Sequence, residues 1–270
     1  MNYLDVVNFE AYVAGCAVNS KVVVLWDNPD TTPRTNGTTI WLPRLTSVTS
    51  NEWLTRIRYF VKHETSHIQH SDFAYLNKMR PSGLLALVNN LLEDHRIDYL
   101  NDSEYAGDSV TSNSFWLLYA EDINKRLFRS EDVELQNQQK LTAPLFIWDS
   151  SIRTWIDNAT LLHDAVLSTI DEEGKQRLEL LQKYSSELQT LREIRDPINA
   201  APKILDLSRR IVQDLYGADP EDMLDKESST GEGLSSDESD KPSKDKAMDV
   251  SKLISDMGLK HEDMRDGKAM

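Results

Sequence analysis

Residues 50–76 read SNEWLTRIRYFVKHETSHIQHSDFAYL, and this stretch decides the fold. Its apolar residues recur at the three- and four-residue intervals that line one face of a helix. The recurring positions are Trp53, Leu54, Ile57, Phe60, Val61 and Ile68. We therefore predict a long helix from Ser50 to about Leu76, with its apolar face against the core.

A polar pentapeptide inside this helix, His63-Glu64-Thr65-Ser66-His67, has the HExxH pattern. Because positions i and i+4 share a helix face, the imidazoles of His63 and His67 can bind one Zn²⁺. Glu64 then points at a water that the zinc polarises and can act as its general base. A chain of this length holds the pattern by chance with odds of about one in a hundred. The alternative is a surface helix with two ordinary histidines.

The third ligand is expected on a second helix, at residues 84–100, within the segment NNLLEDHRID of residues 89–98. Glu93 and Asp94 are adjacent acids in this otherwise apolar helix, and a buried acid needs a metal or a cation. Gluzincins supply a glutamate as the third ligand, which favours Glu93. Helical geometry favours Asp94, which lies on an apolar side of the helix, and Asp94 remains the alternative.

Other side chains near Glu93 and Asp94 are candidates for supporting roles. Asp98 lies one turn further on and can hold a ligand histidine in place. Arg96 can neutralise the spare carboxylate or face the oxyanion of the reaction, and His95, Tyr99 and Tyr105 are further oxyanion candidates. The alternative interpretation is a solvated run of charges.

The other elements are predicted from local patterns. Residues 3–18 indicate an apolar helix, and the β-branched residues 21–26 indicate a buried strand. Residues 38–45 (TTIWLPRL) indicate a short strand that ends at Pro43. Further apolar helices are expected at residues 114–128 and 143–170. The chain is therefore predicted to be α+β and mostly helical, with a small N-terminal sheet.

The C-terminal part divides into two segments. Residues 173–217 hold two amphipathic helical patterns joined at Pro197, which predict a helical hairpin. Its apolar stripes pack on the body in the first interpretation and form a partner-binding arm in the second. Residues 218–270 begin with a polar, acidic stretch that is typical of a linker or a disordered tail, with a possible short helix at 248–257. We thus expect a first domain at residues 1–172.

The net charge is −15, from 45 acidic and 30 basic residues. Residues 219–270 hold 15 of the acids and 8 of the bases, about half of the excess. An acidic body argues against nucleic-acid binding, which needs clustered Lys and Arg. We find no apolar run of membrane-spanning length, no basic signal-peptide region, and a single cysteine, Cys16. A cytoplasmic protein without nucleic-acid or membrane partners is expected.

Three motifs together resemble a known family. Gly37–Pro43, His63–His67 and Leu92–Ile97 follow one another as in the metallopeptidase domain that precedes a von Willebrand factor A (VWA) domain in cobaltochelatase CobT-like proteins of phages and bacteria. The resemblance covers roughly residues 20–105. It implies a zincin-like core and a zinc metallopeptidase acting on a protein or peptide in the cytoplasm of a bacterial or phage-infected cell.

The resemblance also implies partners and a substrate-binding strand. Thr38, Thr39, Ile40, Trp41 and Leu42 resemble the edge strand on which zincins lay an extended substrate, although a plain hairpin strand is equally compatible. The acidic segment takes the place of the linker to the VWA domain, but the 270 residues leave no room for that domain, so we expect either a split or shortened version of the family protein or a fragment of a longer one. Relatives work beside MoxR-type AAA+ ATPases, so such an ATPase or a separate VWA protein is an expected partner. The alternative function is a non-catalytic adaptor or structural protein that retains the zincin fold and uses the hairpin and tail for binding.

Overall fold

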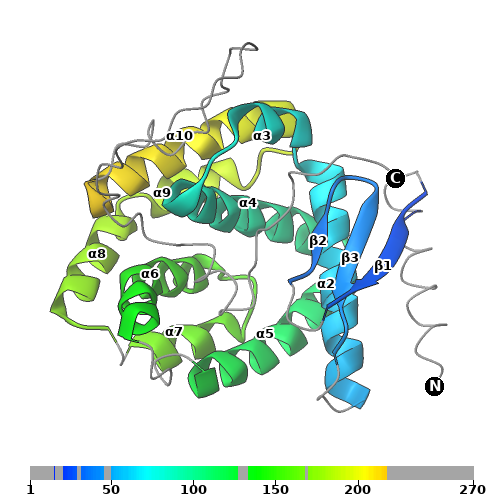
Figure 1. Ribbon diagram of the computed structural model, residues 1–270, viewed down its shortest axis with the longest axis horizontal. Helices are drawn as coiled ribbons and strands as arrows, with labels where there is room; N and C mark the ends of the chain where they lie inside the picture. Colours follow the sequence, from blue (N-terminus) through cyan, green and yellow to red (C-terminus); the bar gives the residue numbers. More distant parts are fainter. Residues whose placement is uncertain are drawn as a thin grey trace, which may run out of the picture.

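The computed structural model describes residues 15, 21–28, 32–45, 50–126, 133–167 and 170–217. Within this part of the chain, helices predominate and one three-stranded sheet lies beside helix α2, which spans Ser50–His70 (Figure 1). The predicted class, α+β and mostly helical with a small N-terminal sheet, is confirmed. The helix expected at residues 3–18, except for residue 15, and the acidic segment 218–270 lie outside the described residues.

The sheet consists of β1 (Val23–Asp27), β2 (Arg34–Thr35) and β3 (Thr39–Pro43), in the order β1-β3-β2. β2 and β3 form an antiparallel hairpin, in whose turn the Asn36 side chain accepts hydrogen bonds from the amides of Thr38 and Thr39 at 3.1 and 2.9 Å. β1 adds to the other side of β3 in parallel, along its full length.

The position of β3 decides between two interpretations and corrects an expectation. Residues 38–42 were interpreted as a substrate-binding edge strand or as a plain hairpin strand, and the second interpretation fits, because β3 is central among the described strands and pairs with β1 and β2. Residues 21–26 were expected to be buried, but β1 is an edge strand, and Val23 and Leu25 are 38% and 45% exposed. Side chains alternate between the two faces of a strand, and one face of this sheet packs on α2. The buried cluster there contains Val22, Ile40, Leu42, Trp53, Ile57 and Val61.

Two helices carry the predicted helical site residues, α2 (Ser50–His70) and α4 (Gly83–Glu104), and the short helix α3 (Phe73–Met79) lies between them in the chain. The helix predicted to reach Leu76 stops at His70, because the Asp72 side chain accepts a hydrogen bond from the Tyr75 amide at 2.9 Å and caps α3. After α3 the chain turns back, and α4 crosses the molecule to meet α2 (Figure 1). The HExxH and LEDHR segments thereby face each other.

The remaining helices pack on α4 or on the helices beside it. They are α5 (Ala106–Arg126), α6 (Val133–Ile152), α7 (Ala159–Leu167), α8 (Glu172–Gln182), α9 (Ser185–Leu191) and α10 (Pro197–Tyr216). The helix predicted at 114–128 is thus part of a longer α5, and the apolar region at 143–170 holds α6 and α7, separated at residues 153–158. Among the described helices, none combines the length and the apolar character that a membrane crossing requires.

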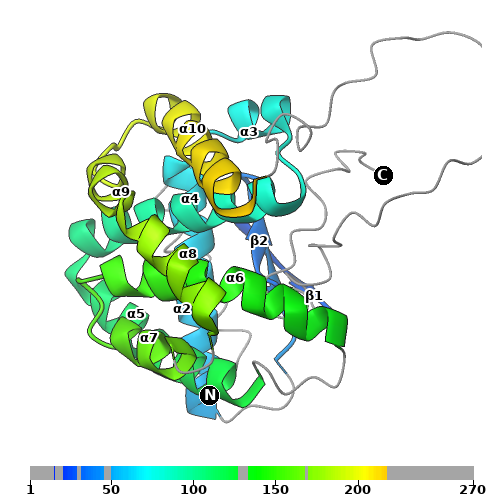
Figure 2. The same cartoon turned by 90° about the vertical axis from the view of Figure 1, so that its left-hand side faces the viewer.

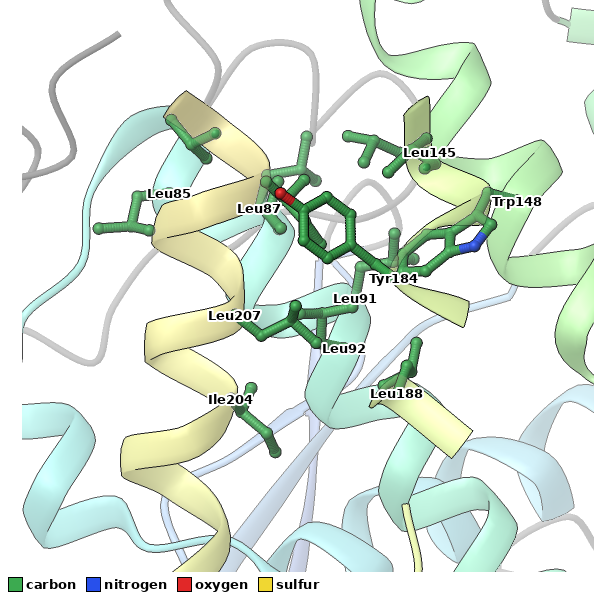
Figure 3. Packing of buried hydrophobic residues seen from close by; sticks show 14 of the residues in the cluster. Leu85, Leu87, Leu91, Leu92, Leu145, Trp148, Tyr184, Leu188, Ile204 and Leu207 are labelled. Carbon is green, nitrogen blue, oxygen red and sulfur yellow. The ribbon is translucent and has the colours of Figure 1, made fainter. Parts of the chain in front are cut away.

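The main hydrophobic core joins α4 to the C-terminal helices. Leu85, Leu92 and Trp148 pack in one cluster with residues of α8, α9 and α10 (Figure 3). Figure 2 shows α8, α9 and α10 along the side of the molecule formed by α4 and α6. Both stripes of the predicted hairpin are buried in this cluster: Leu181, Tyr184, Leu188, Leu191, Ile204, Leu207, Ile211 and Leu215. Residues 173–217 therefore pack on the body. Residues from both sides of position 172 share one hydrophobic core.

Candidate metal centre

The HExxH histidines lie on the side of α2 that meets α4. The ring centroids of His63 and His67 are 4.9 Å apart, and the rings are nearly perpendicular. Their Nε2 atoms lie 3.6 and 3.1 Å from Oδ1 of Asp94 on α4. One ligand atom from each of these three residues lies within 4.8 Å of the others, so the group could hold one metal ion.

Asp94 presents a free oxygen to the two imidazoles. Its Oδ2 accepts a hydrogen bond from Asn90 Nδ2 at 2.9 Å. Its Oδ1 is buried and has no correctly aligned hydrogen-bond partner among the described residues, although it faces both histidines. A buried carboxylate oxygen without a partner is costly. The geometry therefore favours Asp94, the alternative from the sequence, over Glu93 as the third ligand.

Glu93 faces a different part of the protein. Its two carboxylate oxygens accept hydrogen bonds from Nη2 and Nε of Arg96 at 2.6 and 3.0 Å. The Arg96 guanidinium also donates to the carbonyl oxygens of His70 and Ile194, at 2.6 and 2.7 Å. Of the two roles expected for Arg96, these contacts support neutralisation of the spare carboxylate and give no support to an oxyanion role.

Asp98 supports His63, as its position one turn after Asp94 suggested. Asp98 Oδ1 lies 2.9 Å from His63 Nδ1, and its Oδ2 accepts hydrogen bonds from the Tyr59 hydroxyl and from Arg153 Nη1, at 3.2 and 2.7 Å. Burial raises the pKa of Asp98, but the charges of His63 and Arg153 outweigh it and lower that pKa well below its usual range. Asp98 is therefore an ionised acceptor, and His63 Nδ1 donates to it.

His67 is oriented by a hydroxyl. Its Nδ1 lies 3.0 Å from Oγ of Ser71, and this hydroxyl donates its only proton to Glu93 Oε1 at 2.6 Å. Ser71 must then accept from His67, which places the proton of a neutral His67 on Nδ1. In their neutral forms both histidines therefore direct an Nε2 lone pair toward Asp94, the arrangement typical of metal-ligating imidazoles.

The charges of the site also favour a cation. Among the described residues, the carboxylates of Asp94, Asp98 and Asp149 form one group with the guanidinium of Arg153, and a divalent ion would offset the excess of negative charge in this group. Burial lowers the pKa of His63, yet Asp98 and Asp94 outweigh it and raise that pKa, so a proton bound to His63 supplies positive charge when an ion does not. The residues present therefore fit a metal ion.

Glu64 completes the pattern and is 4% exposed. Burial raises the pKa of its carboxyl group, and the charges of His63 and His67 partly oppose this rise. Solvent reaches the ligand group, because the side chains of His63, His67 and Asp94 are 16%, 14% and 18% exposed. Glu64 is thus a buried carboxyl group beside an accessible ligand set.

The remaining oxyanion candidates make contacts elsewhere. His95 is fully buried, and its Nδ1 lies 2.8 Å from Oδ1 of Asp149 on α6. Tyr99 lies under the guanidinium of Arg192, 4.2 Å from its ring centroid, and Tyr105 is 42% exposed at the end of α4. These contacts do not support an oxyanion role for the three residues.

Apart from Asp98, sequence reasoning missed the residues that orient the ligands. Ser71 lies four residues after His67, a spacing that could have indicated contact on a helix. Asp149 and Arg153 have the same spacing in an apolar segment, which could have indicated a buried ion pair. The sequence holds no signal for the contact between Arg153 and Asp98, because they are 55 positions apart.

No family model, no curated protein and no solved structure matches the chain. The resemblance to the CobT-like metallopeptidase domain therefore depends on the three motifs alone.

Proposed function

We propose that this chain is a zinc-dependent peptidase with a zincin-like core. The observation that carries the proposal is the convergence of His63, His67 and Asp94 beside Glu64. Two imidazole nitrogens and one carboxylate oxygen form a ligand set that suits zinc, and catalytic zinc sites commonly use three protein ligands. The order of the sequence motifs supports a relationship with the CobT-like metallopeptidase domains.

The roles of the residues follow from their positions. His63, His67 and Asp94 would hold the zinc, which supplies a polarised water and Lewis-acid activation of the peptide carbonyl. Glu64 takes a proton from the attacking water as its oxygen bonds to the carbonyl carbon. Glu64 then returns the proton to the amine as the C–N bond breaks. A glutamate suits this exchange, because its carboxylate can accept a proton and its carboxylic acid form can donate one.

The adaptor hypothesis depended on the helical hairpin and the acidic tail as binding regions. The apolar faces of the hairpin are buried in the main core, and the tail lies outside the described residues. The described part of the chain therefore favours the peptidase. A MoxR-type ATPase or a VWA protein remains a proposed partner, and a protein or peptide remains the proposed substrate.

The proposal is tested by metal analysis and proteolysis with the full chain. We expect about one zinc ion per chain and cleavage of an unfolded protein such as reduced casein. A chelator should stop the cleavage and added Zn²⁺ should restore it, because the ligand set has to be filled for hydrolysis. Absence of a stoichiometric metal ion from the folded protein, after incubation with Zn²⁺, would overturn the proposal.

A pair of variants decides the third ligand. Asp94→Ala removes the oxygen that faces both histidines, so zinc affinity should fall more than about 100-fold, beyond the loss typical of outer residues. Glu93→Gln should keep zinc affinity within about tenfold, because the glutamine can still accept from Ser71. Zinc affinities measured in competition with a chromophoric chelator distinguish the two. Loss of zinc in Glu93→Gln and retention in Asp94→Ala would reverse the assignment.

A further inference from the structure

Arg153 lies directly after α6 and is buried between carboxylates from two helices. Its Nη1 donates to Asp98 Oδ2 on α4, and its Nε donates to Asp149 Oδ2 on α6, both at 2.7 Å. The Arg153 side chain is 3% exposed, and its guanidinium lies 5.1 Å from the ring centroid of Trp116 and 5.9 Å from that of Trp155. The guanidinium is therefore fixed on several sides.

A continuous set of contacts leads from Arg153 to the metal ligands. Arg153 and Tyr59 both donate to Oδ2 of Asp98, which leaves Oδ1 for His63 Nδ1 at 2.9 Å. This division between the two oxygens fixes the rotation of the carboxylate. The rotation of the carboxylate in turn fixes the ring of His63, whose Nε2 faces Asp94. The position of Arg153 thus determines where one ligand nitrogen lies.

The Nε side of the Arg153 guanidinium is also fixed, by Asp149. Asp149 accepts from Arg153 through Oδ2 and lies 2.8 Å from Nδ1 of His95 through Oδ1. Asp149 is 3% exposed, so water has little access to its carboxylate. A guanidinium can donate to two carboxylates in fixed directions, whereas an ammonium group is a point charge without this fork. The site therefore uses arginine for its geometry as well as for its charge.

We propose that Arg153 is a positioning residue of the metal centre, which holds Asp98 so that His63 presents Nε2 to the ion. This inference depends on the proposed zinc site, but not on peptidase activity. Arg153 belongs to the region outside the motifs that indicated the site, and it links α6 to the ligand-bearing helices. Asp149 and His95 hold Arg153 in place.

The test compares Arg153→Lys with the wild-type chain. Lysine keeps the charge but loses the two-directional donation, so zinc affinity should fall about 10- to 100-fold, as for other residues that orient metal ligands. The visible absorption bands of the Co²⁺-loaded protein should also change, because they report the ligand geometry. Tyr216→Phe is the control, since it deletes only a part-buried hydrogen bond to the Leu141 carbonyl, far from the histidines in sequence and contacts.

The outcomes separate this inference from the proposed function. Zinc affinity and Co²⁺ bands equal to those of wild type in Arg153→Lys would overturn the positioning role while leaving the zinc site standing. A wild-type chain that binds neither Zn²⁺ nor Co²⁺ would overturn both. If Arg153→Lys fails to fold, Asp149→Asn gives the answer, because it keeps Arg153 and removes the negative charge of its second anchor, which also contacts His95. A weaker zinc affinity in Asp149→Asn supports the role, and an unchanged affinity contradicts it.

Discussion

Replacement of Glu64 by glutamine should reduce peptide hydrolysis about 10²- to 10⁴-fold, the usual contribution of a general base. Glutamine has nearly the same shape but cannot accept the proton of the attacking water. Glu64 is not part of the ligand group of His63, His67 and Asp94, so zinc content should stay at the wild-type level. The comparison needs initial rates of peptide cleavage and metal analysis on the same preparations.

Glu187→Gln serves as the matched control for this substitution. Glu187 lies on α9 and pairs with Arg210 on α10 at 3.0 and 2.5 Å, in a partly exposed position. The same chemical change there should leave both cleavage and zinc unaltered, because surface pairs contribute little. Full activity in Glu64→Gln would reject the assigned general base. Loss of zinc in Glu64→Gln would show that Glu64 acts in binding instead.

The sequence indicated which residue types form the candidate site more clearly than how these residues are arranged. The HExxH spacing fixes His63 and His67 on one face by helix geometry alone. The choice between Glu93 and Asp94 is a rotation of about 100° on the second helix, and it depends on which side of α4 meets α2. Leu91–Glu93 and His95–Asp98 are all buried, so the sequence pattern of α4 has no single apolar face to reveal this side. Only the packing decides it.

Contacts between segments that are distant in the sequence could not be predicted from local patterns either. β3 was predicted as a strand, but its central place in the sheet depends on β1 pairing in parallel with it, which no local pattern encodes. Arg153 and Asp98 similarly meet only because α6 packs beside α4. Helix spacing in the sequence indicates which residues share a face within one or two helix turns. The residues missed or misplaced depend on contacts between distant segments.

A chain that ends at residue 172 should fail to fold. It lacks eleven buried residues of the main core: the eight stripe residues Leu181, Tyr184, Leu188, Leu191, Ile204, Leu207, Ile211 and Leu215, and also Ala200, Leu205 and Val212. At about 1.5 kcal/mol or more for each of the eight stripe residues, their loss alone is about 12 kcal/mol or more. That loss is comparable to the whole stability of a typical domain, about 5–15 kcal/mol. Thermal unfolding followed by circular dichroism should show no cooperative transition.

The truncation should also disturb the site, because Arg96 loses the Ile194 carbonyl to which its Nη1 donates at 2.7 Å. Arg96 holds Glu93, which orients His67 through Ser71. A chain that ends at residue 217 is the control, since the described clusters all lie before that point, and it should unfold cooperatively and bind zinc as the full chain does. If the chain of residues 1–172 instead melts cooperatively and binds zinc, the C-terminal helices are a separate unit. The packing of α8, α9 and α10 on α4 and α6 would then contribute little to the stability of the metal centre.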